Sequence, residues 1–179
     1  MPEPPSRYSG AQKALHWTMA ALIVTQVAIA IAMTNLGEGP LTNTLFELHK
    51  SFGLTVLALA LVRVAIRSVR GAPPFEPMPD WQRRAAQVSH ATLYVLFILV
   101  PLVGWIATSY CCKPVRFFWT VPVSLPIPDA PTMEAAGWIF RVHIGLAIAL
   151  LAVVAVHVAG ALQHHFISRD RTLLRMLPD

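Results

Sequence analysis

Charged residues are scarce in this chain. Only 13% of its 179 residues are Asp, Glu, Lys or Arg, whereas 55% are hydrophobic. A soluble domain of this size could not keep so much apolar surface from water, which excludes a water-soluble globular protein. Instead, apolar runs recur at roughly the 20-residue length that crosses a bilayer. We therefore expect an all-α, four-helix transmembrane bundle with helices at about 14–34, 45–67, 82–110 and 136–166.

Cysteine is nearly absent too, since the chain has only Cys111 and Cys112. No Cys-x-x-Cys-His motif is present, which excludes covalent haem attachment of that type. No His-Glu-x-x-His motif or cysteine cluster indicates zinc. Because a disulfide between adjacent residues would be strained, we interpret the pair as two small apolar residues that close a helix, with a redox role as the alternative.

The positions of the basic residues predict the orientation in the membrane. The net charge is +5, and ten of the fourteen Lys and Arg residues fall on one side of the predicted bundle. The other four are Lys50, Lys113, Arg116 and Arg141. By the positive-inside rule we expect both termini in the cytoplasm, so the basic balance reflects topology and not nucleic-acid binding. The polar leader at residues 1–12 has no cleavage site, so we expect no signal peptide.

Histidines occur inside the apolar runs, where an imidazole is costly and usually marks a functional site. His143 and His157 are fourteen residues apart, so they leave nearly the same helix face at levels about 21 Å apart. His49 lies near the outer start of its helix, as His143 does, whereas His16 lies near the inner start of the first helix. Matching the levels predicts that His16 faces His157 and that His49 faces His143.

Four histidines in two layers predict two haem b groups, each with two axial imidazoles. Neutral imidazole is a good iron ligand, and two of them leave no open position for oxygen. Gly53 and Gly160 follow His49 and His157 on the ligand faces, where a small residue lets the flat porphyrin approach. Haem propionates need cationic partners. The candidates are Arg63 and Arg67 at the inner edge, and Lys50, Lys113, Arg116 and Arg141 at the outer edge.

Three more histidines leave alternatives open. His90 lies near the inner end of the third helix. It could replace His16 as a ligand, bond a propionate or a quinone, or only pack. His164 and His165 close the last helix at the membrane interface, where cationic side chains suit a helix end. A proton or quinone role for this pair is the alternative.

At this point the sequence resembles the bacterial cytochrome b561 family of small four-helix dihaem membrane proteins. The matching pieces cover nearly the whole chain, apart from the outer loop that holds the cysteines. They are Ala14-Leu-His16-Trp17, His49-x-x-x-Gly53, the Ser89-His90 to Pro101-x-x-Gly104 segment of the third helix, His143, His157 and the Gln163–Pro178 ending.

The resemblance implies two non-covalent b haems ligated by the four paired histidines, and electron transfer between the periplasmic side and the quinone pool. Similar proteins include a superoxide oxidase that reduces ubiquinone. A cationic outer mouth would steer an anion such as superoxide, although the same residues suit propionates and lipid headgroups. Two other classes stay open: a membrane subunit that passes electrons to a dehydrogenase or hydrogenase partner protein, and a haem-free scaffold or transporter.

Overall fold

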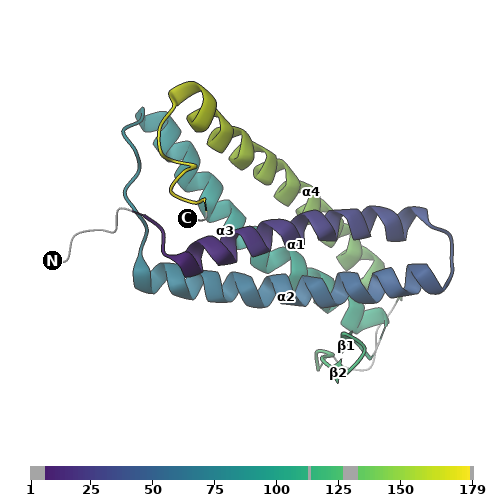
Figure 1. Cartoon of the computed structure of the whole chain (residues 1–179). Coiled ribbons are helices and arrows are strands. Elements are labelled where there is room, and N and C mark those ends of the chain that lie inside the picture. Colours follow the sequence, from purple (N-terminus) through teal and green to yellow (C-terminus); the bar gives the residue numbers. More distant parts are fainter. Residues whose placement is uncertain (1–6, 113, 127–132, 178–179) are drawn as a thin grey trace.

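Four long helices make up most of the protein (Figure 1). The structure is a computed structural model that describes residues 7–112, 114–126 and 133–177. The helices are α1 (Gly10–Asn35), α2 (Pro40–Arg70), α3 (Asp80–Cys111) and α4 (Met133–Gln163), which a five-residue π-helix, η1 (His164–Ser168), continues. All four are long and apolar enough to cross a membrane. The predicted all-α fold with four spanning helices is confirmed.

The first two helices begin earlier than their apolar runs predict, because each has an N-terminus of its own. The Ser9 hydroxyl accepts from the Gln12 backbone N–H, and the Gln12 side chain accepts from the Ser9 N–H, so a capping box starts α1 at Gly10. Pro40 occupies the first position of α2, where its missing N–H would have no helical partner anyway. The predicted starts near residues 14 and 45 therefore mark the apolar surface, not the helix ends.

Side-chain contacts gather the start of α1, the α2–α3 connection and the C-terminal tail at one end of the bundle. Gln12 Nε2 donates to the carbonyl of Gly71, and Trp17 Nε1 donates to the carbonyl of Met176. We call this the inner end, following the orientation predicted from the charges. The outer end carries the α1–α2 connection and a short hairpin of two strands, β1 (Arg116–Phe117) and β2 (Val121–Pro122) (Figure 1).

The helices pack in chain order, α1 on α2, α2 on α3 and α3 on α4. One apolar cluster centres on Met19, Val56 and Ala60, and a second joins Leu93 and Leu96 of α3 to Leu150 of α4. Among the described residues, no Cα atom of α4 comes within 8 Å of α1 or α2. The α1–α2 pair and α4 are thus both packed on α3 but are held apart from each other.

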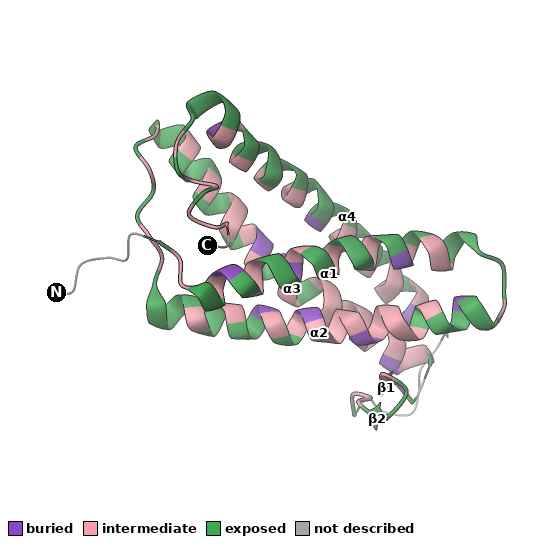
Figure 2. Cartoon of the chain, viewed as in Figure 1, coloured by how far each residue is buried: buried purple, intermediate pink, exposed green. Residues whose placement is uncertain are grey.

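Most helical side chains are exposed or half-buried, and the fully buried ones are scattered along the helices (Figure 2). Large apolar residues such as Val24, Ile148 and Val156 are more than 60% exposed. In water such a surface would be unstable, whereas in a bilayer lipid chains cover it. The burial pattern is therefore that of a membrane bundle.

The outer hairpin is docked on the bundle by hydrogen bonds to two serines. The Phe118 N–H donates to Ser51 Oγ of α2 at 2.9 Å, and the Leu125 N–H donates to Ser109 Oγ of α3 at 3.2 Å. The Phe118 ring also packs edge-on against Phe52, with centroids 5.5 Å apart. The described part of this connection, residues 114–126, therefore lies against the outer ends of α2 and α3.

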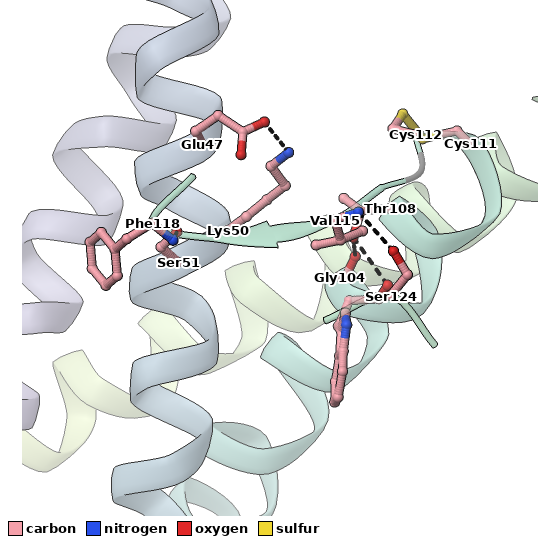
Figure 3. A network of polar contacts seen from close by, with 11 residues as sticks. Glu47, Lys50, Ser51, Gly104, Thr108, Cys111, Cys112, Val115, Phe118 and Ser124 are labelled. Carbon is pink, nitrogen blue, oxygen red and sulfur yellow. Dashed lines mark hydrogen bonds and ion pairs between the residues drawn. A yellow bond between two sulfur atoms is a disulfide. The ribbon is translucent and has the colours of Figure 1, made fainter. Parts of the chain in front are cut away.

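The interpretation of Cys111 and Cys112 as no more than two small residues requires correction, because a disulfide joins them (Figure 3). Cys112 is the C-cap of α3 and has left the helical conformation, with φ −134° and ψ 46°. In a continuing helix adjacent side chains point in different directions. The break in the helix at Cys112 lets the two sulfur atoms meet.

Candidate functional site

Two pairs of histidines face each other across the space between α4 and the α1–α2 pair. At the outer level the ring centroids of His49 and His143 are 6.2 Å apart, with an interplanar angle of 88°. At the inner level those of His16 and His157 are 6.3 Å apart, at 62°. The partners in each pair come from helices whose backbones do not approach closely. Both pairs combine the residues that the depth argument matched.

The ring separations can be compared with what two axial ligands on one metal ion require. With metal–nitrogen bonds of about 2.0 Å and about 1.1 Å from nitrogen to ring centre, two opposed imidazoles have centroids about 6 Å apart. Both pairs meet this value. The centroids of His90 and His157 are 5.2 Å apart, which is shorter than an opposed pair needs. As placed, His16 fits the inner pair better than His90 does.

Two residues of α3 contact His143 of the outer pair. His143 Nδ1 lies 2.9 Å from the carbonyl of Val100, to which it can donate. A Cβ added at Gly104 would lie 2.9 Å from both Cε1 and Nδ1 of His143, so the ring occupies the space of a missing side chain. On the other side, His49 Nδ1 is buried and has no hydrogen-bond partner among the described residues. An imidazole that is held through Nδ1, as His143 is by the Val100 carbonyl, can present Nε2 to a metal ion.

The inner pair lies beside two arginines. Arg63 Nη2 donates to His16 Nδ1 at 3.0 Å, and the Arg63 Cζ atom lies 5.8 Å from the ring centre of Tyr94. Arg63 and Arg67 both line a small cavity at the inner end, which the C-terminal tail helps to close. Its other lining residues are Tyr8, Gln12, Leu15, Ile66, Tyr94 and Met176.

The two predicted glycines differ in their surroundings. A Cβ at Gly53 would lie 3.3 Å from Gln26 Nε2, so Gly53 makes room for a side chain of α1. A Cβ at Gly160 would meet nothing within 4 Å, so the face beside His157 is open. Gly104, which was named above only as the end of a matching segment of the third helix, instead makes room for the His143 ring.

The outer cations are partly compensated by their neighbours. Lys50 is paired with Glu47 of the same helix, and its side chain is only 15% exposed (Figure 3). The Arg141 guanidinium lies over the Trp138 ring, 4.6 Å from its centre, and Arg116 is exposed at the start of β1. Lys113 lies outside the described residues. Glu47 precedes Lys50 by three residues, a spacing that predicts a helical ion pair.

Comparison with known proteins identifies the family. The family model described as prokaryotic cytochrome b561 matches residues 7–179. The chain belongs to the prokaryotic cytochrome b561 family. Escherichia coli K12 has two similar proteins, cytochrome b561 homolog 2 (31% identity, 97% of this chain and 92% of the relative) and homolog 1 (32%, 97% and 98%). The probable superoxide oxidase CybB of Yersinia pestis is 30% identical, with 96% of each chain covered.

Cytochrome b561 proteins bind haem b and transfer electrons in membranes, and the residues present fit such a cofactor. The opposed imidazoles and the space that Gly104 leaves for the His143 ring are features of a ligand site. The nearby arginines supply donors for carboxylates. Among the residues that the structure describes, no three His, Cys, Asp or Glu side chains converge on one metal position. Two facing imidazoles can hold a haem iron, whereas a structural zinc site takes four ligands.

A second cluster in this cytochrome joins η1 to the C-terminal tail. His164, which is buried, lies with its Nδ1 atom 2.5 Å from Asp170 Oδ2, and the other Asp170 oxygen accepts from the Thr172 N–H at 2.8 Å. Partial burial alone would raise the pKa of Asp170, but the hydrogen bonds from Thr172 and His164 outweigh it and lower that pKa. His165 instead packs against Phe166, with ring centroids 4.7 Å apart.

Sequence reasoning missed Asp170, because six residues exceed the spacing at which side chains meet on an α-helix. The π-helix η1 and the turn after it bring Asp170 back to His164. The signal available in the sequence was the short distance from His164 to the only acidic residue among the twelve residues before Pro178.

Proposed function

We propose that this cytochrome holds two haem b groups, one between His16 and His157 and the other between His49 and His143. The observation that carries the proposal is the pair of ring separations, 6.3 and 6.2 Å, across helices whose backbones stay apart. Haem b supplies a one-electron couple when bound. Two such groups at levels about 21 Å apart would let electrons cross most of the membrane.

The proposed reaction oxidises superoxide at the outer end and reduces ubiquinone. Two superoxide ions each give up one electron and become O₂, while one ubiquinone takes up both electrons and two protons to become ubiquinol. The relative from Yersinia pestis, named a probable superoxide oxidase, supports this choice of donor. The exposed cations Arg116 and Arg141 at the outer end also support superoxide as the donor, because surface cations raise the local concentration of a small anion.

The outer residues divide into ligands and steering groups. His49 and His143 would hold the outer haem as its two protein ligands, and a haem with two imidazole ligands would pass electrons without binding oxygen. Arg116 and Arg141 attract superoxide, together with Lys113. Lys50 contributes less than its formal charge, because Glu47 compensates it.

The inner residues anchor the cofactor and handle protons. Ligation through His16 Nε2 requires a proton on Nδ1, and Arg63 has only donors to offer. With the haem bound, Arg63 would therefore bond a propionate instead of His16, and Arg67, which lines the same small cavity, would be a second donor for it. The His164–Asp170 pair holds a proton close to the inner interface for quinone reduction. His90, beside His157, is a second candidate for bonding a propionate or the quinone.

The orientation follows from the charges. Because most arginines and lysines lie at the inner end, we assign the inner end to the cytoplasm of a bacterial inner membrane, with both termini on that side. Superoxide would then be collected from the periplasm, and membrane lipid would surround the exposed apolar faces.

Stopped-flow mixing of the purified protein with superoxide, with and without ubiquinone, tests the proposal. We expect the absorption of reduced haem to rise without quinone, and ubiquinol to form when quinone is present. Haem reduction without quinone turnover would contradict the superoxide–ubiquinone reaction and favour a subunit that serves a dehydrogenase or hydrogenase. A colourless protein would indicate a scaffold or transporter.

A further inference from the structure

Gln26 is a polar side chain in the middle of α1, and it contacts the backbone of a histidine on another helix. Its Nε2 atom donates to the carbonyl of His49 at 3.0 Å. It lies in the notch that Gly53 leaves on α2, since a Cβ there would be 3.3 Å from Nε2. Gln26 is therefore held within one helical turn of the His49 side chain.

Two buried atoms at this contact have no hydrogen-bond partner. One is Gln26 Oε1, which accepts hydrogen bonds, and the other is His49 Nδ1. Since Gln26 Nε2 already faces a carbonyl, the amide cannot be flipped, and its oxygen must be the free atom. If His49 binds iron through Nε2, its Nδ1 carries a hydrogen and needs an acceptor. The two unsatisfied atoms thus complement each other.

The opposite ligand of the outer pair already has such an acceptor. His143 Nδ1 lies 2.9 Å from the Val100 carbonyl, which fixes its tautomer and its ring orientation. His49 has no comparable backbone partner among the described residues. A side chain must supply the acceptor, and Gln26 is the polar side chain already bonded to that residue.

We propose that Gln26 is a positioning residue for the outer haem: its Oε1 accepts the Nδ1–H of His49 and sets the tautomer and plane of that axial ligand. This inference rests on the proposed ligation by His49. A hydrogen bond at Nδ1 makes the ligating nitrogen more basic, and a more basic ligand favours the oxidised iron. Gln26 therefore lowers the reduction potential of the outer haem relative to the same site without it.

The test is a redox titration of the full-length, haem-loaded protein in detergent, followed by low-spin electron paramagnetic resonance of the oxidised form. Gln26→Met keeps the size of the side chain but removes the acceptor, whereas Gln26→Glu keeps a carbonyl acceptor. Thr25→Val is the matched control, because Thr25 is exposed on the same helix turn and bonds only the Ala21 carbonyl.

For Gln26→Met we expect one of the two couples to become about three- to tenfold easier to reduce, at most 59 mV for a one-electron couple, with a changed resonance from the same haem. Gln26→Glu should return that couple to the wild-type value or below it, and Thr25→Val should change neither couple. Unchanged potentials and resonances in Gln26→Met would overturn the inference.

Loss of the outer haem can be interpreted as well. If Gln26→Met loses one haem and Gln26→Glu retains it, the acceptor role is supported. Loss in both variants would overturn it, since Glu keeps the acceptor. His49→Ala separates this inference from the proposed function: it must remove one haem, and retention of both would contradict the ligand assignment itself. If His49→Ala loses a haem and Gln26→Met behaves as wild type, only the role of Gln26 is wrong.

Discussion

Replacing Gly104 with alanine should weaken haem binding at the outer level while sparing the inner one. The added Cβ would lie 2.9 Å from Cε1 and Nδ1 of His143. Carbon atoms in contact prefer about 3.5–4.0 Å, so the ring must move by at least about half an ångström. The neighbour that must yield is the His143 ring, which is already bonded to the Val100 carbonyl, so under the proposed ligation the shift would weaken the bond from His143 to the metal.

The expected magnitude follows from the cost of overpacking. Inserting one extra carbon into a filled site typically costs about 1–3 kcal/mol. If haem binding bears that cost, its affinity falls roughly 5- to 150-fold. The lost hydrogen bond to the Val100 carbonyl adds about 1 kcal/mol at most. The inner pair, about 21 Å away along α4, should be unaffected.

The assay is the haem-to-protein ratio measured at limiting haem, combined with a redox titration that resolves two couples. Gly104→Ala should approach one haem per chain and lose one couple. Gly145→Ala is the matched control, because Gly145 is two residues from His143 and its Cβ would meet nothing within 4 Å. Two haems and two unaltered couples in Gly104→Ala would refute the assignment of His143 as a ligand in this position.

Two further predictions concern the ends of the bundle. Glu47→Gln removes the carboxylate that compensates the charge of Lys50, so the rate constant for reaction with superoxide should rise, and this rise should fade with added salt. Stopped-flow rates that are unchanged at low salt would contradict steering by Lys50. Asp170→Asn should loosen the C-terminal tail, measured as faster proteolysis of that segment. Because the folded pKa of Asp170 is lowered, its contribution to stability is complete above the ordinary Asp pKa and is lost as the pH falls through the folded value. In wild type, protection should therefore fall only at acidic pH, and Asp170→Asn should show no such step; a wild-type step near neutral pH would contradict this origin.

The architecture could be predicted from the sequence because membrane solvation is a strong constraint. Apolar runs of about 20 residues admit few structures other than helices, so the number of helices and their order follow directly. The helix ends could not be predicted as well. The apolar run predicted a start near residue 45, but Pro40 begins α2 because proline suits the first helical position.

The levels of the histidines could also be predicted, because helix geometry converts the fourteen residues between His143 and His157 into depth. Which residues support the rings could not. The roles of Gly104 and Gln26 depend on packing between helices, and nothing in the sequence near either residue names its partner. The Cys111–Cys112 disulfide was missed because it depends on where α3 stops.

The proposal depends most on which histidine pairs with His157 at the inner level, because the rings of both His16 and His90 approach it. Their centroids lie 6.3 and 5.2 Å from that of His157, and only the longer separation suits two opposed ligands. Haem content and redox titration of His16→Ala and His90→Ala test this most directly. We predict one haem and one couple in His16→Ala, and two haems and two couples in His90→Ala. The reverse result, or two intact low-spin haems in His16→Ala, would contradict the two-haem arrangement proposed for this cytochrome.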